Sequence, residues 1–209
     1  MPRTVPQKKQ GRAAQKESRP KEIVDAALAV FAGKGFAGAR LDDVAEKAGI
    51  SKGTIYLYFD TKEDLFKACV RETLGAHLEG SRDLADSFDG DTSDLLRKIV
   101  GGIGQQLSKG EFRTILLLLI SEGPRFPELV SFYQNEIIRP GMGILGAVIQ
   151  RGVERGEFKR TGLSDFPMLL MSPVMMTVIW NHLFSDLKEI NLDEALQVHL
   201  TTLLNGLQV

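Results

Sequence analysis

Cysteine and histidine are scarce in this chain of 209 residues, and neither sign of charge dominates. Cys69 is the only cysteine, which excludes an internal disulfide and any cysteine-pair redox or metal motif. We expect it to be a small buried apolar residue. The three histidines, His77, His182 and His199, lie far apart in the sequence and suggest no metal site. The N-terminus lacks the continuous apolar core of a secretory signal, so we expect an intracellular, cytoplasmic protein.

A visible catalytic set is also missing. The sequence shows no cluster of serine, histidine and acid, no metal-ligand spacing and no glycine loop that would cradle phosphates. We therefore expect no enzyme activity, no metal and no cofactor. The hydrophobic content of 43% is ordinary for a globular protein with a sizeable core.

The charge is unevenly distributed although the net charge is only −1. Residues 1–21 carry seven basic side chains against Glu17, a net charge of +6, which leaves −7 for the rest of the chain. We expect residues 1–19 to form a basic flexible arm. Such an arm is disordered without DNA, and on DNA it can neutralise phosphates or enter a minor groove.

Residues 41–59 predict two short helices joined by a tight turn. Apolar residues from Leu41 to Ala48 recur at offsets of three and four, which is typical of one helix face. Gly49 can close that helix in the left-handed conformation, and Ser51 can cap the next one. The pattern therefore indicates a helix-turn-helix.

The second of these helices has an unusual outer face. Ile55 and Phe59 are one turn apart and can point inward, whereas Lys52, Gly53 and Tyr56 share another face. A cationic, aromatic and small face is typical of a recognition helix in a DNA major groove. The alternative is an ordinary surface hairpin of helices with partly buried tyrosines.

The run GISKGTIYLYFDTKEDLF, residues 49–66, resembles the DNA-binding signature of the tetracycline-repressor (TetR) family of bacterial regulators. The resemblance covers roughly residues 20–70. It implies an all-α fold of about nine helices. An N-terminal helix-turn-helix domain would be followed by a C-terminal helical domain for ligand binding and dimerisation. Arg40 stands where the family often has a threonine, which puts that threonine's capping or phosphate contact in doubt here.

The resemblance and the helix face together give a set of candidate DNA contacts. Lys52, Gly53 and Tyr56 are expected at base edges, and most of the others at phosphates. In the resembled family a lysine at this position contacts a phosphate, so the resemblance implies a phosphate contact for Lys62, at the start of the next helix. The alternative is that Lys62 is simply solvated. The full set is Arg40, Ser51, Lys52, Gly53, Thr54, Tyr56, Tyr58 and Lys62.

The helix-turn-helix domain is expected at residues 20–65 and the helical effector-binding and dimerisation domain at residues 66–209. We place the boundary loop between Gly80 and Asp94, where the sequence turns polar and loses periodicity. A long helix is expected over residues 127–153. Pro140 and nearby glycines weaken its middle and indicate either a kink or a close helix crossing.

Residues 166–185 contain no charged side chain, so a membrane span has to be considered. We reject it because Asp165 and Asp186 flank the stretch without a cationic anchor and Pro173 interrupts it. A helix that is apolar all round is buried on both sides. We therefore expect the two C-terminal helices to form a four-helix homodimer interface, as in the resembled family.

Methionines and large aromatic residues of the second domain are suitable walls for an apolar cavity. Plain core or dimer packing is the alternative for each of them. The candidate ligand contacts are Phe112, Leu116, Ile120, Phe132, Ile149, Met171, Met175 and Trp180.

These observations predict a sequence-specific transcriptional regulator, a repressor that binds a palindromic operator in double-stranded DNA as a dimer. By resemblance, an unidentified apolar small-molecule effector releases it. The alternatives are a helical small-molecule carrier or enzyme, and a constitutive DNA-binding regulator without a ligand.

Overall fold

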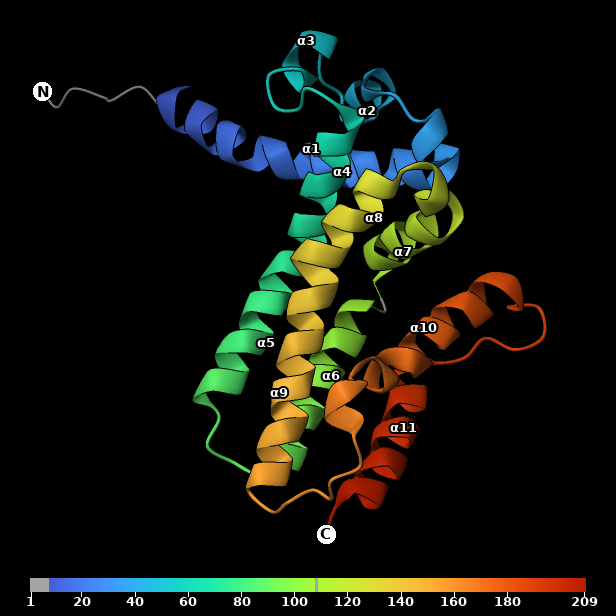
Figure 1. The fold of residues 1–209 in the computed structure, drawn as a ribbon. Helices are drawn as coiled ribbons and strands as arrows, with labels where there is room; N and C mark the ends of the chain where they lie inside the picture. The colour runs from blue at the N-terminus through green and yellow to red at the C-terminus, as the bar shows by residue number, and fades with distance from the viewer. Residues whose placement is uncertain (1–7, 108) are drawn as a thin grey trace, which may run out of the picture. The chain divides into compact units, whose positions relative to one another are not determined.

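The computed structural model describes residues 8–107 and 109–209, which form the helices drawn in Figure 1. The all-α prediction is confirmed for these residues, whose only β pairing is an isolated bridge between Phe158 and Gln208. The helices group into two compact units. The first contains the chain up to Glu72 together with Thr114–Val130, and the second contains Thr73–Arg113 and Ser131–Val209.

Helix α1 (Lys8–Gly38) begins before residue 20, where the helix-turn-helix domain is expected to start, and Pro20 lies inside it. Proline removes one N–H and disfavours a helical residue before it, but neither effect forbids a longer helix. Residues 1–7 of the predicted basic arm lie outside the described residues. Gly35 interrupts α1, because its φ of 68° lies in the left-handed region that suits glycine.

The core of the first unit forms around three phenylalanines. Phe31 and Phe36 from α1 meet Phe66 of α4 (Lys62–Val70), and the three ring centroids lie 5.6 to 6.1 Å apart. All three side chains are almost completely buried. Edge-to-face aromatic packing of this kind adds to the free energy gained by burial. It gives the short helices α2 (Leu41–Lys47) and α3 (Lys52–Ile55) a firm base, since α2 packs on α1 and α3 packs on α2.

Helix α4 continues through the π-turn η1 (Arg71–Gly75) into α5 (Ala76–Ser87). The predicted boundary loop from Gly80 to Asp94 is therefore wrong over its first half and also at its end, because α6 already begins at Thr92. No residue of α5 is fully buried, which explains why its sequence lacks a clear apolar stripe. The helix is instead held by packing against α6 (Thr92–Leu107) and α9 (Arg139–Glu154).

Helix α6 is central to the second unit. It contacts α5, α9, α10 (Met168–Leu183) and α11 (Leu192–Leu207). Its side chains Leu95, Leu96, Ile99 and Val100 are buried. Gly104 permits a close approach to α11, because a Cβ there would overlap the side chain of Leu196.

The long helix expected at residues 127–153 is present but divided. Helix α7 (Gly110–Glu122) and the 3-10 turn η2 (Gly123–Arg125) precede α8 (Pro127–Tyr133), and the π-turn η3 (Gln134–Ile138) joins α8 to α9.

Pro140, the second residue of α9, explains the π-turn. It has no N–H, and its ring disfavours an α-helical carbonyl four residues earlier. The backbone widens at this point, and the N–H of Arg139 donates to the carbonyl of Gln134, five residues back.

A close crossing occurs on the same helix. A Cβ on Gly146 would lie 3.2 Å from the carbonyl oxygen of Ser164, in the 3-10 turn η4 (Leu163–Asp165). The helix therefore has both features that its sequence left open, a local distortion and a close crossing. Counting α4 with α5 and α8 with α9 as single interrupted helices, the described residues form the expected nine.

Candidate nucleic-acid interface and ligand cavity

The turn between α2 and α3 has the geometry expected from its sequence. Gly49 has a φ of 65°, and the N–H of Ile50 donates to the carbonyl of Ala45 at 2.9 Å, which closes the corner. Ala45 is 1% exposed and Ile55 is fully buried. The small side chain of Ala45 thus leaves room for α3, and Ile55 fixes α3 from behind.

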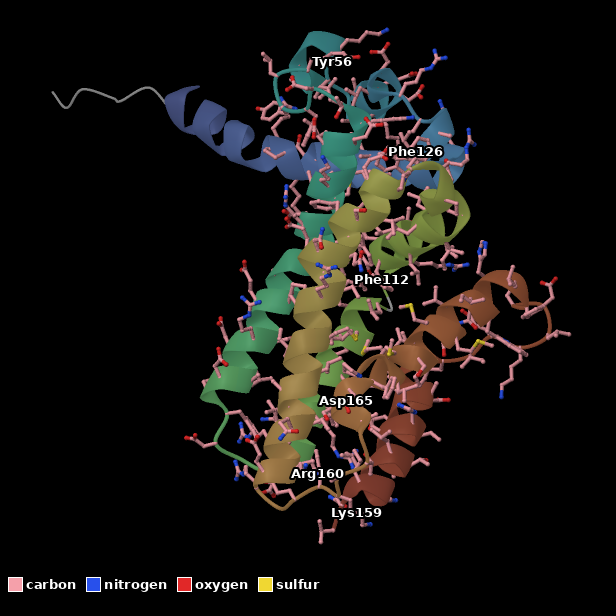
Figure 2. All side chains as sticks on the ribbon, in the orientation of Figure 1. Tyr56, Phe112, Phe126, Lys159, Arg160 and Asp165 are labelled. Carbon is pink, nitrogen blue, oxygen red and sulfur yellow. The ribbon has the colours of Figure 1, made fainter. Side chains whose placement is uncertain are left out.

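The opposite side of α3 faces solvent. Lys52 and Gly53 are exposed, and Tyr56 is 51% exposed at the end of the helix (Figure 2). Tyr58 is half-buried in the turn that follows. The structure therefore brings together on one exposed surface the residues that we expect at base edges.

Two of the expected phosphate contacts also act within the fold. The Ser51 hydroxyl accepts from the Thr54 N–H at 3.1 Å and shares a 2.7 Å hydrogen bond with the Thr54 hydroxyl. The Thr61 hydroxyl caps α4 in the same way, because it accepts from the N–H of Asp64 at 3.1 Å. The Ser51 cap was expected from the sequence, and threonine is likewise a preferred residue at a helix N-cap.

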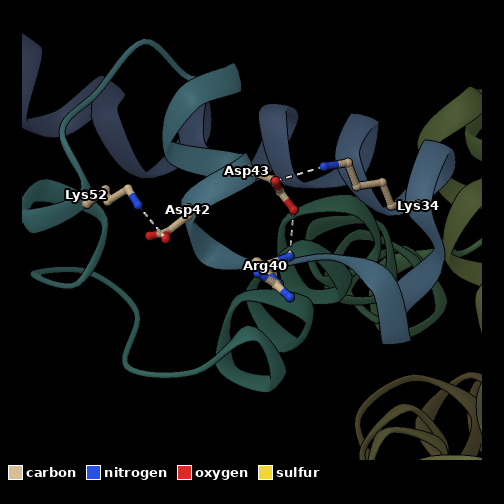
Figure 3. Close-up of polar contacts among 5 residues, drawn as sticks. All are labelled: Lys34, Arg40, Asp42, Asp43 and Lys52. Atoms are coloured by element: carbon tan, nitrogen blue, oxygen red, sulfur yellow. Dashed lines mark hydrogen bonds and ion pairs between the residues drawn. The ribbon is translucent and has the colours of Figure 1, made fainter.

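Ion pairs surround the start of α2, as Figure 3 shows. The Lys52 ammonium lies 2.7 Å from the Asp42 carboxylate, and this hydrogen bond raises the pKa of Lys52. Asp43 accepts from the backbone N–H of Arg40 at 3.1 Å and pairs with Lys34 at 2.8 Å. The hydrogen bond from Lys34 lowers the pKa of Asp43. The backbone of Arg40 is thus fixed through Asp43.

Lys62 lies at the corner that follows Gly35. Its ammonium donates to the carbonyls of Phe36 and Ala37 at 2.8 and 3.2 Å and lies 4.6 Å from the centre of the Phe36 ring. The Glu122 carboxylate accepts from the backbone N–H groups of the same two residues, at 2.6 and 2.7 Å. Opposite charges therefore hold both sides of one short backbone segment.

Sequence reasoning missed Glu122 and Leu57. Glu122 lies 86 residues after Phe36, so no local pattern connects them. Leu57 is an apolar residue that is 82% exposed, directly after Tyr56. Its exposure could have been suspected from its position between two tyrosines on the outer side, and an exposed apolar side chain there is suited to a thymine methyl group.

A cavity of about 280 Å³ lies within the second unit. Its walls come from α5, α6, α7, α9 and α10, together with residues of η1, α8 and η3. The lining is largely apolar. Its polar side chains belong to His77, Ser81, Gln106 and Tyr133, and Gly141 also contributes to it. The apolar side chains are Leu74, Leu78, Ile99, Ile103, Leu107, Phe112, Ile137, Ile138, Met142, Ile144, Leu145, Met168, Met171 and Met175.

The structure places three of the eight expected ligand contacts in this lining, namely Phe112, Met171 and Met175 (Phe112 is labelled in Figure 2). The other five lie elsewhere. Trp180 donates through its indole N–H to the carbonyl of Lys188 at 2.9 Å, so it fixes the segment after α10. The remaining four, which are not cavity-lining either, are Leu116, Ile120, Phe132 and Ile149.

A second hollow, of about 200 Å³, lies where α9 meets the segment before α10. Lys159, Arg160 and Asp165 contribute its charged groups (Figure 2). Ile149, expected at a ligand, lines this hollow.

Two kinds of site are not found among the described residues. The described residues contain no group of three or more histidine, cysteine, aspartate or glutamate side chains that could hold a metal ion. None of the described helices combines the length and apolar character that crossing a membrane requires.

Cys69 is buried, and burial raises the pKa of its thiol to about 12, as expected for a packing residue.

Comparison with solved structures shows the same fold. The chain superimposes on the regulator FadR from Bacillus subtilis, solved in complex with stearoyl-CoA, with a TM-score of 0.74 at 24% identity, covering 89% of this chain and 98% of FadR. It matches the SmeT–triclosan complex with a TM-score of 0.76 at 18% identity, covering 91% of each chain.

Sequence comparison extends this result. The fatty acid metabolism regulator protein of Bacillus subtilis (strain 168) is 30% identical over 146 residues, which are 69% of this chain and 74% of the relative. The family described as bacterial regulatory proteins, tetR family, matches residues 23–69, and the tetracyclin repressor-like C-terminal domain matches residues 86–195. The chain therefore belongs to the tetracycline-repressor (TetR) family of DNA-binding transcriptional regulators.

Proposed function

We propose that this regulator reads operator DNA through the exposed side of α3. The carrying observation is that Lys52, Gly53 and Tyr56 are exposed above the fully buried Ile55. A short helix with a cationic N-terminus and aromatic hydroxyls is suited to base edges and adjacent phosphates. Contact with DNA requires Lys52 to exchange its ion pair with Asp42 for phosphate or base contacts, and Arg40, Ser51, Thr54, Tyr58 and Lys62 are proposed to complete the interface.

The protein is proposed to bind a palindromic operator as a homodimer. Helices α10 and α11 pack together, with Leu170 and Val174 of α10 completely buried. On the same helix Met168 and Met176 are each 58% exposed, and Leu183 is 61% exposed. Exposed apolar side chains in such number indicate a protein interface. A second copy of this surface would cover them in a four-helix arrangement.

The cavity is proposed to be the site of an apolar effector with an aliphatic chain. Phe112, Met171 and Met175 are the expected contacts that line it. The presence of a cavity favours a ligand-switched regulator over a constitutive one with a filled core, and relatives in the same fold are solved with stearoyl-CoA and triclosan. Binding of the effector is proposed to lower the affinity of the protein for DNA, so that the protein represses until the effector is present. We further propose that this repressor is cytoplasmic.

The DNA-binding proposal is tested by selecting bound fragments from the source genome and measuring affinity for them against salt concentration. Lys52→Ala should weaken binding to the operator by about 1–3 kcal/mol and relax discrimination at the base pair that Lys52 contacts, as expected for one lost base contact. Lys188→Ala, an exposed lysine near the C-terminus, is the matched control. Unchanged affinity and base preference in Lys52→Ala would remove Lys52 from the interface.

The dependence of DNA affinity on salt also tests whether Lys62 contacts a phosphate. Its ammonium is already bonded to two backbone carbonyls. If it contacts no phosphate, Lys62→Ala should lower stability and leave the salt slope unchanged. A slope reduced by about one would support the phosphate contact that family resemblance implies.

The switch is tested with a cavity-filling variant. Met175→Trp should occupy part of the space available to an effector, so DNA release by that effector should be lost while DNA affinity in its absence is kept. Gln105→Trp changes an exposed residue of α6 that does not line the cavity and serves as the control. Release that persists at the wild-type effector concentration in Met175→Trp would place the effector outside this cavity.

A further inference from the structure

Leu57 is an unusually exposed apolar residue of the helix-turn-helix. Of the large apolar side chains that the structure describes, only that of the C-terminal Val209, at 85%, is more exposed than that of Leu57, at 82%. An isolated exposed leucine is common on protein surfaces and by itself indicates nothing. Leu57 differs by its position, because it directly follows Tyr56, which is proposed to reach a base edge. Its side chain adds little to the packing of the fold and is free to meet DNA.

Gly53, one turn before Leu57, lacks a side chain for a reason that the fold itself does not supply. Its backbone is helical, with φ outside the left-handed region. Of the described atoms, a Cβ there would meet only the Ser51 hydroxyl oxygen, at an ordinary distance of 3.9 Å. Alanine would therefore fit and would favour the helix. A glycine in such a place is typical of a surface that another molecule approaches closely.

These two residues belong to the same side of the recognition helix. The N–H of Phe59 donates to the carbonyl of Ile55 at 3.0 Å, so helical winding extends past Leu57. Residues four apart on a helix are neighbours on its surface, and the side chain of the later one leans toward the earlier turn. Position 53 offers no side chain to cover Leu57. A base edge that approaches α3 at Gly53 therefore meets an aliphatic group beside it.

The chemistry of Leu57 limits what it can recognise. Its side chain has no charge and no hydrogen-bonding group, so it can stabilise neither a phosphate nor a polar base edge. In the major groove the apolar group of a base is the 5-methyl group of thymine. Cytosine has a hydrogen atom in its place. Leu57 would therefore distinguish thymine from cytosine by one methyl group.

We infer that Leu57 packs against the 5-methyl group of one thymine in each half of the operator and so makes DNA affinity depend on that methyl group. This contact rests on the proposed function, since it adds a residue to the same DNA-reading surface and specifies the base that this residue recognises.

The size of the effect follows from the group that is buried. Burial of one methyl group changes an affinity by about fourfold. A dimer on a palindromic operator would make the contact twice, at two distant positions that contribute independently. Removing both methyl groups should therefore weaken binding by about fifteenfold.

The test replaces thymine by deoxyuridine in the operator selected from the source genome, at one position at a time and in both half-sites together. This replacement removes the 5-methyl group and keeps every hydrogen-bonding group of the base pair. The affinity of the full-length protein is measured by fluorescence anisotropy at one salt concentration. The wild-type protein should lose about fifteenfold in affinity at the thymine that Leu57 contacts.

Substitutions of Leu57 assign this loss to one side chain. Alanine removes most of the aliphatic group, and asparagine replaces it by a polar group of similar size. Leu57→Ala and Leu57→Asn should therefore bind the thymine and deoxyuridine operators equally well, and either variant decides alone. Leu57→Met keeps an aliphatic side chain and should keep the preference for thymine. Val209→Ala removes a similarly exposed aliphatic side chain at the C-terminus and, as the matched control, should keep the full wild-type ratio.

The outcomes separate the thymine contact from the proposed function. Equal affinity of the wild-type protein for thymine and deoxyuridine at every position would overturn the methyl contact and leave operator reading by α3 in place. A preference for thymine that survives in Leu57→Ala or Leu57→Asn would also overturn it, because another residue would then contact the methyl group. If selection yields no specifically bound fragment, the proposed function itself fails, and the thymine contact fails with it.

Discussion

Glu122→Gln tests whether Glu122 holds the corner after Gly35. Each carboxylate oxygen accepts one backbone N–H, from Phe36 at 2.6 Å and from Ala37 at 2.7 Å. Glutamine offers one oxygen, so one of these N–H groups would face the NH₂ of the new side chain. A negative charge at the last residue of α7 is unfavourable to the helix dipole. The carboxylate of Glu122 therefore does not stabilise α7 itself, and its contacts with Phe36 and Ala37 are the stabilising role that remains.

The expected cost is that of one charge-assisted hydrogen bond. Such bonds contribute roughly 1.5–3 kcal/mol, and partial exposure of Glu122 favours the middle of this range, about 2 kcal/mol. This local loss corresponds to about thirtyfold faster amide exchange at Phe36 or Ala37. Local exchange is the better assay, because two compact units need not unfold in one step.

The control is Glu128→Gln, which removes the same charge from an exposed residue in the first turn of α8. Hydrogen exchange followed by mass spectrometry or NMR should show no change at residues 36 and 37 in this control. If the Glu122 and Glu128 variants exchange at the same rates there, the carboxylate does not hold the corner. Gly35→Ala should give a related loss, because a Cβ there would lie 2.5 Å from Oε1 of Glu122.

Three further results are expected. Ser51→Ala should destabilise the helix-turn-helix by about 1 kcal/mol, the usual effect of losing an N-cap, whereas Ser51→Thr should not, as denaturant titration can show. Gly152→Ala should lower stability by about 1–3 kcal/mol, since the new Cβ would overlap the buried ring of Phe158, and an unchanged melting temperature would contradict this packing. Burial lowers the pKa of His199 from 6.5, so the unfolded chain binds a proton first and stability should fall as the pH drops below about 6.5. His199→Gln should lose less stability than the wild type over that range, and equal losses would show that other groups govern it.

The helix-turn-helix could be predicted closely because its signals are local. Gly49, Ser51 and Ile55 act through neighbours a few residues away, and the structure places each in its expected role. The contact between Gln106 and Thr73 could not be predicted in this way. Gln106 meets Thr73 across 33 residues, and a glutamine near the end of an amphipathic helix gives no sign of its burial.

The predicted ligand contacts show the same limit. Met171 and Met175 are one turn apart on α10, and both line the cavity, as a shared helix face predicts. Trp180 was included for its residue type alone, although aromatic rings also fix loops, as its bond to Lys188 shows. The helix over residues 80–87 was missed because tertiary packing, rather than its own apolar stripe, stabilises it.

The π-turn η3 has a consequence for how ligand preference can change between relatives. Tyr133 precedes this turn, and Gly141 and Leu145, after it, line the same cavity. Deleting one residue between 134 and 138 would restore regular α-helical winding and rotate all of α9 by about 100° relative to Tyr133. A relative one residue shorter at this point would present a different set of side chains to its ligand without any substitution in the lining. Length variation in η3 is thus a route to a new effector.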